Sequence, residues 1–203
     1  MSYASEFRKQ LEKRLGKSNV TFYPTWDKKP RGIGWKGTGG KPVALLCHHT
    51  AGAGTTSTDP KHVGNSKTAD QPQATFIQKH AVPYANFTVG RSGHVWVHSL
   101  YPVHHAGLGT FKGTPFDRWG VPKNMGNDYM LGAELVSKGL KKDFTQKEKD
   151  ALGALANACR DANGWKGIKY RLPNHKTWAP TRKIDTRYKL SALRAWALRM
   201  RNR

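Results

Sequence analysis

Two short apolar runs constrain the fold of this chain more than any other feature. Val43 to Cys47 is continuously apolar, and Met130 to Val136 is a second run of strand length. A run without polar alternation is typical of a strand that is buried on both faces, as in the centre of a sheet covered by helices. Segments with helical periodicity precede and follow these runs. The pattern therefore predicts an α/β domain.

The remaining elements are predicted from apolar spacing and from end signals. Thr145 to Glu148 forms a capping box, which should open a helix that ends near Gly164. The other predicted helices are 3–15, 70–80 and about 187–201. Gly90 to Gly93 separates two apolar stretches and predicts a hairpin of strands 87–89 and 95–97. Long loops are expected over 23–42, 51–68 and 106–127.

Length and composition favour one domain. The chain has 203 residues, no internal repeat and no low-complexity linker. We expect one unit over 1–203, with a core at about 40–190 preceded by an N-terminal helix and a basic loop over 1–40. Cys47 and Cys159 are the two cysteines, too few for a disulfide scaffold, and both are expected to be buried thiols.

The net charge predicts a polyanionic partner. The formal charge is +22, from 35 Lys and Arg against 13 Asp and Glu. Nucleic acid, anionic lipid and an acidic cell wall would all attract such a chain, and charge alone does not choose among them. The polar N-terminus has no signal-peptide pattern, and no apolar run approaches the ~20 residues of a membrane span. We expect a soluble chain made in the cytoplasm.

A possible metal site lies near the C-terminus, from His175 to Asp185. Lys183 follows the histidine by eight residues, and Asp185 comes two residues later. Imidazole nitrogen and carboxylate oxygen suit Zn²⁺, and a neighbouring lysine could stabilise negative charge on a substrate oxygen. The alternative is a solvated loop, because basic loops are common in this chain.

A second possible ligand follows the first apolar run. His48 lies at the end of the strand predicted from Val43 to Cys47, and ligand sites gather at strand ends in α/β sheets. Because strand residues alternate in direction, His49 should face the other side, so that only one of the pair points into a given site. The alternative is two polar residues where the strand meets solvent.

Glu134 is a lone carboxylate inside the second apolar run. Acidic side chains are almost never buried without a partner. Burial would raise the pKa of Glu134 and suit it to act as a general base. The alternative is an edge strand with Glu134 facing water.

Several of these features occur together in one known family. The sequence resembles the zinc-dependent N-acetylmuramoyl-L-alanine amidases of type 2, which are related to peptidoglycan-recognition proteins and occur among phage endolysins. The resemblance spans roughly 40–190, and its motifs appear in family order. They are His48-His49-Thr50-Ala51, Gly93, His105-Ala106-Gly107, Gly132-Ala133-Glu134-Leu135, and His175 followed by Ala179-Pro180-Thr181-Arg182-Lys183-Ile184-Asp185.

The resemblance implies a fold and a mechanism. The fold would be a central mixed β-sheet flanked by helices. Zn²⁺ would be held by His48, His175 and Asp185, with water in the open fourth position. Glu134 would be the general acid and base, and Lys183 would stabilise the tetrahedral oxyanion. The enzyme would hydrolyse the amide between N-acetylmuramic acid and L-alanine in peptidoglycan.

Two positions depart from some members of the family. Where those members have a catalytic Tyr followed by His, this chain has Ala85-Asn86. Members with a small residue there carry the strand glutamate instead, and Glu134 is present. Other members use Cys as the third ligand, whereas this chain has Lys183 at that position and Asp185 after it. The resemblance implies substrate contacts at His105 and Asn86, and His104 is expected to face away.

The preferred function is a peptidoglycan amidase, a phage endolysin or another lytic enzyme of the cell wall. It would be a monomer without a separate cell-wall-binding domain, reaching the wall after release through a membrane hole made by another protein. Peptidoglycan would be its partner, and anionic wall polymers could attract its positive charge. One alternative is a non-catalytic peptidoglycan-binding module of the same fold, which would need a broken zinc triad. The other is a basic nucleic-acid-binding metalloprotein, disfavoured because no specific nucleic-acid motif appears.

Overall fold

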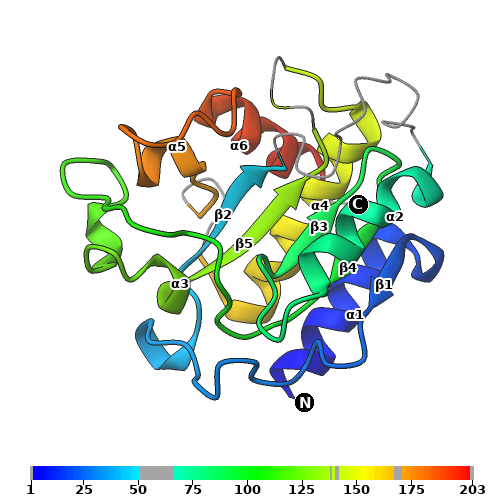
Figure 1. The fold of residues 1–203 in the computed structure, drawn as a ribbon, viewed down its shortest axis with the longest axis horizontal. Coiled ribbons are helices and arrows are strands. Elements are labelled where there is room, and N and C mark those ends of the chain that lie inside the picture. The colour runs from blue at the N-terminus through cyan, green and yellow to red at the C-terminus, as the bar shows by residue number, and fades with distance from the viewer. Residues whose placement is uncertain (1, 51–65, 138, 140–141, 167–170, 202–203) are drawn as a thin grey trace.

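A computed structural model describes residues 2–50, 66–137, 139, 142–166 and 171–201 (Figure 1). The strands are β1 (Val20–Phe22), β2 (Ala44–His49), β3 (Phe87–Val89), β4 (Val95–Val97) and β5 (Met130–Leu135). The α-helices are α1 (Tyr3–Leu15), α2 (Lys67–Gln78), α3 (Gly126–Tyr129), α4 (Gln146–Asn163), α5 (His175–Trp178) and α6 (Leu190–Arg199). Short 3₁₀ turns are η1 (Lys17–Asn19), η2 (Thr38–Gly40) and η4 (Asp117–Trp119).

The five strands form one mixed sheet in the order β1-β4-β3-β5-β2. Strands β2, β5 and β3 are parallel to one another, and β4 turns back antiparallel to β3. Strand β1 pairs parallel with β4 at the far edge. The predicted α/β class, with a mixed sheet flanked by helices, is therefore confirmed.

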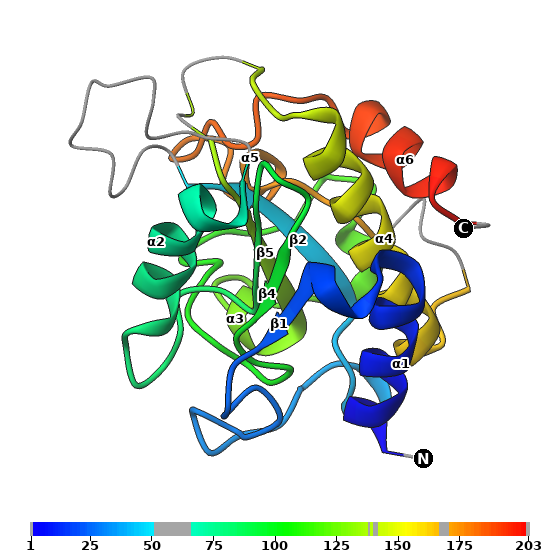
Figure 2. The same cartoon turned by 90° about the vertical axis from the view of Figure 1, so that its right-hand side faces the viewer.

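The two faces of the sheet bury different partners. Leu45 and Cys47 of β2 belong to a core cluster with residues of α1, α4 and α6, whereas Ala44 and Leu46 belong to a second cluster with Trp178 and loop residues after β4. This alternation follows from the two-residue period of a strand. Figure 2 shows α1, α4 and α6 together on one side and α2 on the other.

Helix α4 begins and ends as its sequence predicts. The Thr145 side chain accepts the N–H of Glu148, and the Glu148 side chain accepts the N–H of Thr145, so the capping box is confirmed. Gly164 ends the helix with a left-handed backbone (φ 66°), which glycine adopts without strain. Both cysteines are buried free thiols, as expected.

An extended segment after α4 lies along the outer edge of β2. The Leu45 N–H donates to the Arg171 carbonyl at 2.9 Å, and the Cys47 N–H donates to the Pro173 carbonyl at 2.9 Å. Cys47 and Asn174 form an isolated parallel bridge. This pairing covers the edge of β2 and brings the next residue, His175, beside the end of that strand.

Several boundaries differ from the sequence prediction. Helix α2 begins at Lys67 instead of residue 70, and α6 runs over Leu190–Arg199, shorter than 187–201. Strand β1 was missing from the prediction. The loop expected over 51–68 lies mostly outside the described residues, as does Ala51 of the family motif. Among the described helices, none combines the length and the apolar character needed to cross a bilayer.

Candidate active site

The site begins where β2, β5 and β3 end side by side. The register places His48 of β2 opposite Glu134 of β5, and Glu134 opposite Thr88 of β3. Alternation puts His48 on the same face as Leu46, away from α4. The carboxyl ends of parallel strands are where α/β folds place their ligand sites.

His175 reaches this edge because Asn174 fixes the chain around it. Asn174 pairs with Cys47 and caps α5, its side-chain oxygen accepting the Thr177 N–H at 3.0 Å. Ten residues later the chain returns, and the Lys176 N–H donates to the backbone carbonyl of Asp185. His175 and Asp185 therefore approach His48 from one short segment.

Three buried donor atoms converge at this point. His48 Nδ1 lies 2.8 Å from His175 Nδ1, and Asp185 Oδ2 lies 3.0 Å from His175 Nδ1 and 3.6 Å from His48 Nδ1. The three residues are buried, with exposed fractions of 1% for His48, 3% for His175 and 6% for Asp185. Ligand atoms about 2.0–2.1 Å from a tetrahedral ion would lie about 3.3 Å apart. The three residues thus have the spacing of a metal-binding group.

The outer hydrogen bonds define which ring nitrogens carry protons. His175 Nε2 lies 3.0 Å from the Ala106 carbonyl, which can only accept, so that nitrogen carries the hydrogen. His105 Nε2 is likewise bound to the Met130 carbonyl at 2.7 Å, which leaves His105 Nδ1 as an acceptor. His48 Nε2, 3.1 Å from His105 Nδ1, is therefore a donor.

Both inner Nδ1 atoms are left with lone pairs, facing each other and the Asp185 carboxylate. Three lone pairs at this spacing repel one another unless a cation or a proton lies among them. Two imidazole nitrogens and one carboxylate oxygen form a set that suits Zn²⁺, and zinc-bound histidines usually donate their outer N–H to a carbonyl or a similar acceptor. The residues present therefore fit a zinc ion.

The protonation of the group agrees with metal binding. Burial, and then the neighbouring His175, lower the pKa of His48 to about 4. Burial alone would raise the pKa of Asp185, but its interactions with His175 and His48 outweigh burial and hold that pKa below its usual range. His48 is then neutral and Asp185 ionised at neutral pH, which are the forms that bind metals.

Glu134 stands beside the group with one oxygen unpartnered. Its Oε1 lies 4.0 Å from His48 Nδ1, and its Oε2 is buried without a hydrogen-bond partner. Burial, and then the charge of Asp185, raise the pKa of Glu134 to about 8, although Lys183 opposes them. Because β5 lies between β3 and β2, the alternative of an edge strand with Glu134 facing water is wrong.

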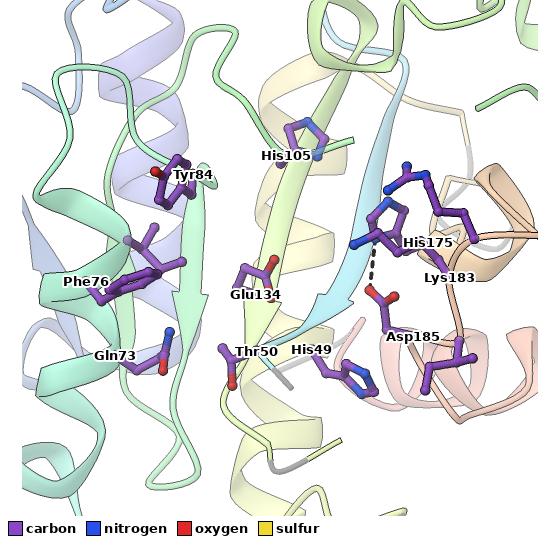
Figure 3. A pocket seen from close by; sticks show the side chains of 13 residues that line it. His49, Thr50, Gln73, Phe76, Tyr84, His105, Glu134, His175, Lys183 and Asp185 are labelled. Atoms are coloured by element: carbon purple, nitrogen blue, oxygen red, sulfur yellow. Dashed lines mark hydrogen bonds and ion pairs between the residues drawn. The ribbon is translucent and has the colours of Figure 1, made fainter. Parts of the chain in front are cut away.

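A cavity of about 350 Å³ opens over these residues. In Figure 3, Gln73, Phe76 and Tyr84 stand on one side, His175, Lys183 and Asp185 on the other, and Glu134 between them. The lining is completed by His49, Thr50, Ile77, His105, Arg182 and Ile184. A cleft with aromatic residues on one side and charged residues on the other can hold a substrate with apolar and polar parts.

Comparison with known proteins identifies the family. Residues 38–188, about three quarters of the chain, match the sequence profile described as N-acetylmuramoyl-L-alanine amidase. The chain belongs to this family. The type-2 amidase resemblance drawn from its motifs is thereby confirmed. No curated protein sequence matches the chain.

Solved structures of similar proteins share the amidase fold. A selenomethionine derivative of AmpD has a TM-score of 0.54 and 19% identity, covering 88% of this chain and 93% of its own. The Ph2119 endolysin, from the Thermus scotoductus bacteriophage Ph2119, scores 0.52 at 13% identity, covering 88% and 98%. A Drosophila PGRP-LB mutant in complex with tracheal cytotoxin scores 0.52 at 16%, covering 83% and 88%. At these identities, the likeness concerns the fold.

The amidase residues expected from sequence do not all face the cleft. Glu134, His175, Lys183 and Asp185 line it, and His48 is buried against His175. Of the two neighbouring histidines, His49 lines the cleft, whereas His48 belongs to the buried metal-binding group.

Two expected substrate contacts have different surroundings. His105 lines the cleft. Asn86 is 0% exposed and is not among the lining residues. Its side-chain oxygen accepts the Gly132 N–H at 2.8 Å, and its amide donates to the carbonyls of Ser99 and Tyr101 at 2.9 and 2.8 Å. Asn86 therefore ties three backbone segments together.

Sequence reasoning missed other parts of the cleft. Arg182 lines it while donating to the carbonyl of Leu108 at 2.8 Å, and Phe76 and Tyr84 form its aromatic side. Arg182 follows directly from the family motif and could have been found there. Phe76 and Tyr84 carry no such signal, because their place across the cleft from Lys183 depends on how α2 and the loop after it pack against the sheet.

Proposed function

We propose that this chain is a zinc-dependent N-acetylmuramoyl-L-alanine amidase that hydrolyses the amide between N-acetylmuramic acid and L-alanine in peptidoglycan. The observation that carries the proposal is the convergence of three lone pairs, from His48, His175 and Asp185, beside a carboxylate with an unpartnered oxygen in a cleft. Membership of the amidase family supports the reaction class.

Zn²⁺ would be held by His48 Nδ1, His175 Nδ1 and Asp185 Oδ2. A zinc ion with three protein ligands supplies a Lewis acid and lowers the pKa of a water molecule in its open position. The protein contributes the surroundings. His48 is neutral, Asp185 carries the negative charge, and burial keeps bulk water from competing with these donors.

Glu134 would move the proton. Its carboxylate takes a proton from the attacking water and delivers it to the amide nitrogen as the carbon–nitrogen bond breaks, so that L-alanine leaves as a free amine. The unpartnered Oε2 is available for this hydrogen bond, and a pKa raised by burial makes the carboxyl a stronger base. Lys183, which lines the same cleft, would stabilise the negative charge on the carbonyl oxygen.

We further propose that the whole chain acts as one catalytic domain, as a monomeric lytic enzyme of the endolysin type. Its net charge of +22 would attract it to anionic polymers of the cell wall. An intact set of ligands and a positioned carboxylate disfavour the alternative of a binding module without activity.

Digestion of purified peptidoglycan tests this function. The protein is incubated with it alone, with a chelator, and with a chelator followed by Zn²⁺, and the new ends are identified by mass spectrometry. We expect free L-alanine amines on intact glycan strands, lost with chelator and restored by Zn²⁺. His48→Ala should be inactive, and His104→Ala, at an exposed neighbour of the site, serves as the control. Cut glycan strands, or release of alanine that is indifferent to the chelator, would refute the proposal.

A further inference from the structure

We propose that the dipeptide His105-Ala106, held in place by Asn127, sets the tautomer of both metal-binding histidines. His105 is then a positioning residue, in addition to lining the cleft. This inference rests on the zinc site proposed above. It concerns how that site is prepared to receive the metal, and its test reads metal binding and ring protonation directly.

A relay of two hydrogen bonds leads from His48 through His105 to the backbone. His48 Nε2–H donates to His105 Nδ1 at 3.1 Å, and His105 Nε2–H donates to the Met130 carbonyl at 2.7 Å. The two rings stand edge-on, 88° apart with centroids separated by 5.3 Å. Since the carbonyl can only accept, the relay has one direction, and it leaves the lone pair of His48 on Nδ1.

His175 has an outer acceptor in the same dipeptide. Its Nε2–H donates to the carbonyl of Ala106, the residue next to His105, at 3.0 Å. One dipeptide therefore supplies the outer acceptor of both histidines, through a side chain for His48 and a main-chain carbonyl for His175. With both acceptors in place, both Nδ1 atoms face inward as lone pairs.

Asn127 fixes this dipeptide against the start of β5. Its Oδ1 accepts the N–H of His105 at 2.9 Å and the N–H of Ala106 at 2.7 Å. Gly132 gives the imidazole room, because a Cβ there would lie 2.4 Å from His105 Cγ. The His105 ring and the Ala106 carbonyl are thus held by a side chain 22 and 21 residues away, respectively. In the described hydrogen bonds, Asn127 contacts neither His48 nor His175.

As a consequence, both histidines present a lone pair on Nδ1 before the metal binds. A histidine with the hydrogen on the inner nitrogen cannot bind a metal until the proton moves, and the tautomer is set by the bond that the other nitrogen makes. Loss of such outer partners typically lowers metal affinity by about 10- to 100-fold. We therefore expect the dipeptide and Asn127 to affect zinc affinity without contributing a ligand.

Two substitutions of His105 separate the halves of the relay. In His105→Asn, the amide oxygen can occupy the place of Nδ1 and still accept from His48. In His105→Gln, the amide nitrogen can occupy the place of Nε2 and still donate to the Met130 carbonyl, but the acceptor for His48 is lost. We expect zinc affinity, measured by competition with a chromophoric chelator, to stay within a few-fold of wild type in His105→Asn and to fall about 10- to 100-fold in His105→Gln.

The tautomer itself is read by ¹⁵N NMR of the imidazoles in metal-free protein. His48 should carry its hydrogen on Nε2 in wild type and in His105→Asn, and should lose that preference in His105→Gln. Equal zinc affinity in all three proteins would overturn the inference. So would equal losses in the two variants, or a greater loss in His105→Asn, provided that circular dichroism shows both to be folded.

Asn127 offers an independent test away from the ligands. Asn127→Asp keeps an acceptor oxygen and should retain zinc affinity, whereas Asn127→Leu removes it and should weaken binding. Asn124→Gly is the matched control, because it deletes a similar bond, from Asn124 Oδ1 to the Gly109 N–H, at a position whose φ of 64° suits glycine. Unchanged affinity in Asn127→Leu would contradict the role of Asn127.

Failure of this inference is distinguishable from failure of the proposed function. Wild-type protein that binds zinc with the expected tautomers and variant pattern but leaves peptidoglycan intact would refute only the amidase function. Chelator-sensitive release of L-alanine with no difference between His105→Asn and His105→Gln would refute only the tautomer relay.

Discussion

Replacing Glu134 with glutamine should remove most activity and, in metal-free protein, change how stability depends on pH. The substitution keeps the size of the side chain and removes its charge. The expected loss of turnover is about 10²- to 10⁴-fold, the usual contribution of a general acid or base. Zinc content should remain stoichiometric, because the donor atoms of His48, His175 and Asp185 are untouched.

The stability effect follows from the raised pKa. Folding shifts the pKa of Glu134 from 4.5 to about 8. Because the folded value is the higher one, the unfolded chain ionises first as pH rises, and stability is lost between the two values. The penalty in metal-free protein is about 3 kcal/mol at pH 7 and about 1 kcal/mol at pH 5. Glutamine does not titrate. The free energy of unfolding of the variant, relative to that of wild type, should therefore be about 2 kcal/mol more favourable to the folded state at pH 7 than at pH 5.

Denaturant unfolding of chelator-treated proteins at the two pH values measures this difference. The cost of burying the unpaired amide of glutamine does not depend on pH, so it cancels when the unfolding free energies at pH 5 and pH 7 are compared. The titrations of groups common to both proteins cancel when the variant is compared with wild type. Glu6→Gln, on α1, controls for the loss of one negative charge. If the difference in unfolding free energy between wild type and Glu134→Gln is the same at pH 5 and pH 7, burial does not raise the pKa of Glu134 and the reasoning is wrong.

Four further outcomes are expected. Asp185→Ala should abolish stoichiometric zinc, measured by atomic absorption; a zinc-loaded variant would remove Asp185 from the ligand set. Burial lowers the pKa of His98 to about 3, so metal-free stability should fall as pH drops below about 6.5, and His98→Gln should reduce that slope by up to about 1.4 kcal/mol per pH unit in denaturant titrations. Gly153→Ala should lower Tm in calorimetry through a loss of about 1–3 kcal/mol, because the new Cβ would lie 2.5 Å from the Trp196 carbonyl; an unchanged Tm would show that α4 and α6 can separate freely. Binding to purified cell walls should weaken with salt in a sedimentation assay, and salt-independent binding would make the net charge incidental.

The elements with strong local signals were predictable. Helix α1 and the hairpin of β3 and β4 occur at their predicted residues, and the capping box opens α4 where the sequence places it. The apolar run of β2 identified a buried strand. In each case the residues themselves determine the outcome, through apolar period or through a side chain that caps its own backbone.

The missed elements depend on distant partners. Strand β1 has three half-buried residues and exists because Val20 to Phe22 pairs with Val95 to Val97, a contact that no local pattern encodes. Helix α5 is only four residues long, held by its Asn174 cap and by the bridge to Cys47. Short elements of this kind gain their stability from tertiary packing more than from propensity.

The candidate site shows the same division at the level of single contacts. The residue types and their spacing indicated His48, His175 and Asp185, because side-chain chemistry appears in the sequence. Their meeting required the segment ending at Asn174 to pair along β2 across a separation of 127 residues between the two histidines.

The orientation of the ligand rings is even harder to predict from the sequence, because it depends on main-chain acceptors. The Ala106 carbonyl accepts the outer hydrogen of His175, and the Met130 carbonyl accepts from His105, which in turn accepts from His48. Any residue type at 106 or 130 would offer the same carbonyl. For Asn86 the motif was misleading in the other direction. Its position suggested a substrate contact, but its side-chain amide forms hydrogen bonds with backbone groups. A sequence motif therefore identifies which side chains gather at a site, while the protonation that makes them ligands follows from where the backbone runs. For this reason, the decisive experiment on this site is one that reads imidazole hydrogens and zinc affinity together.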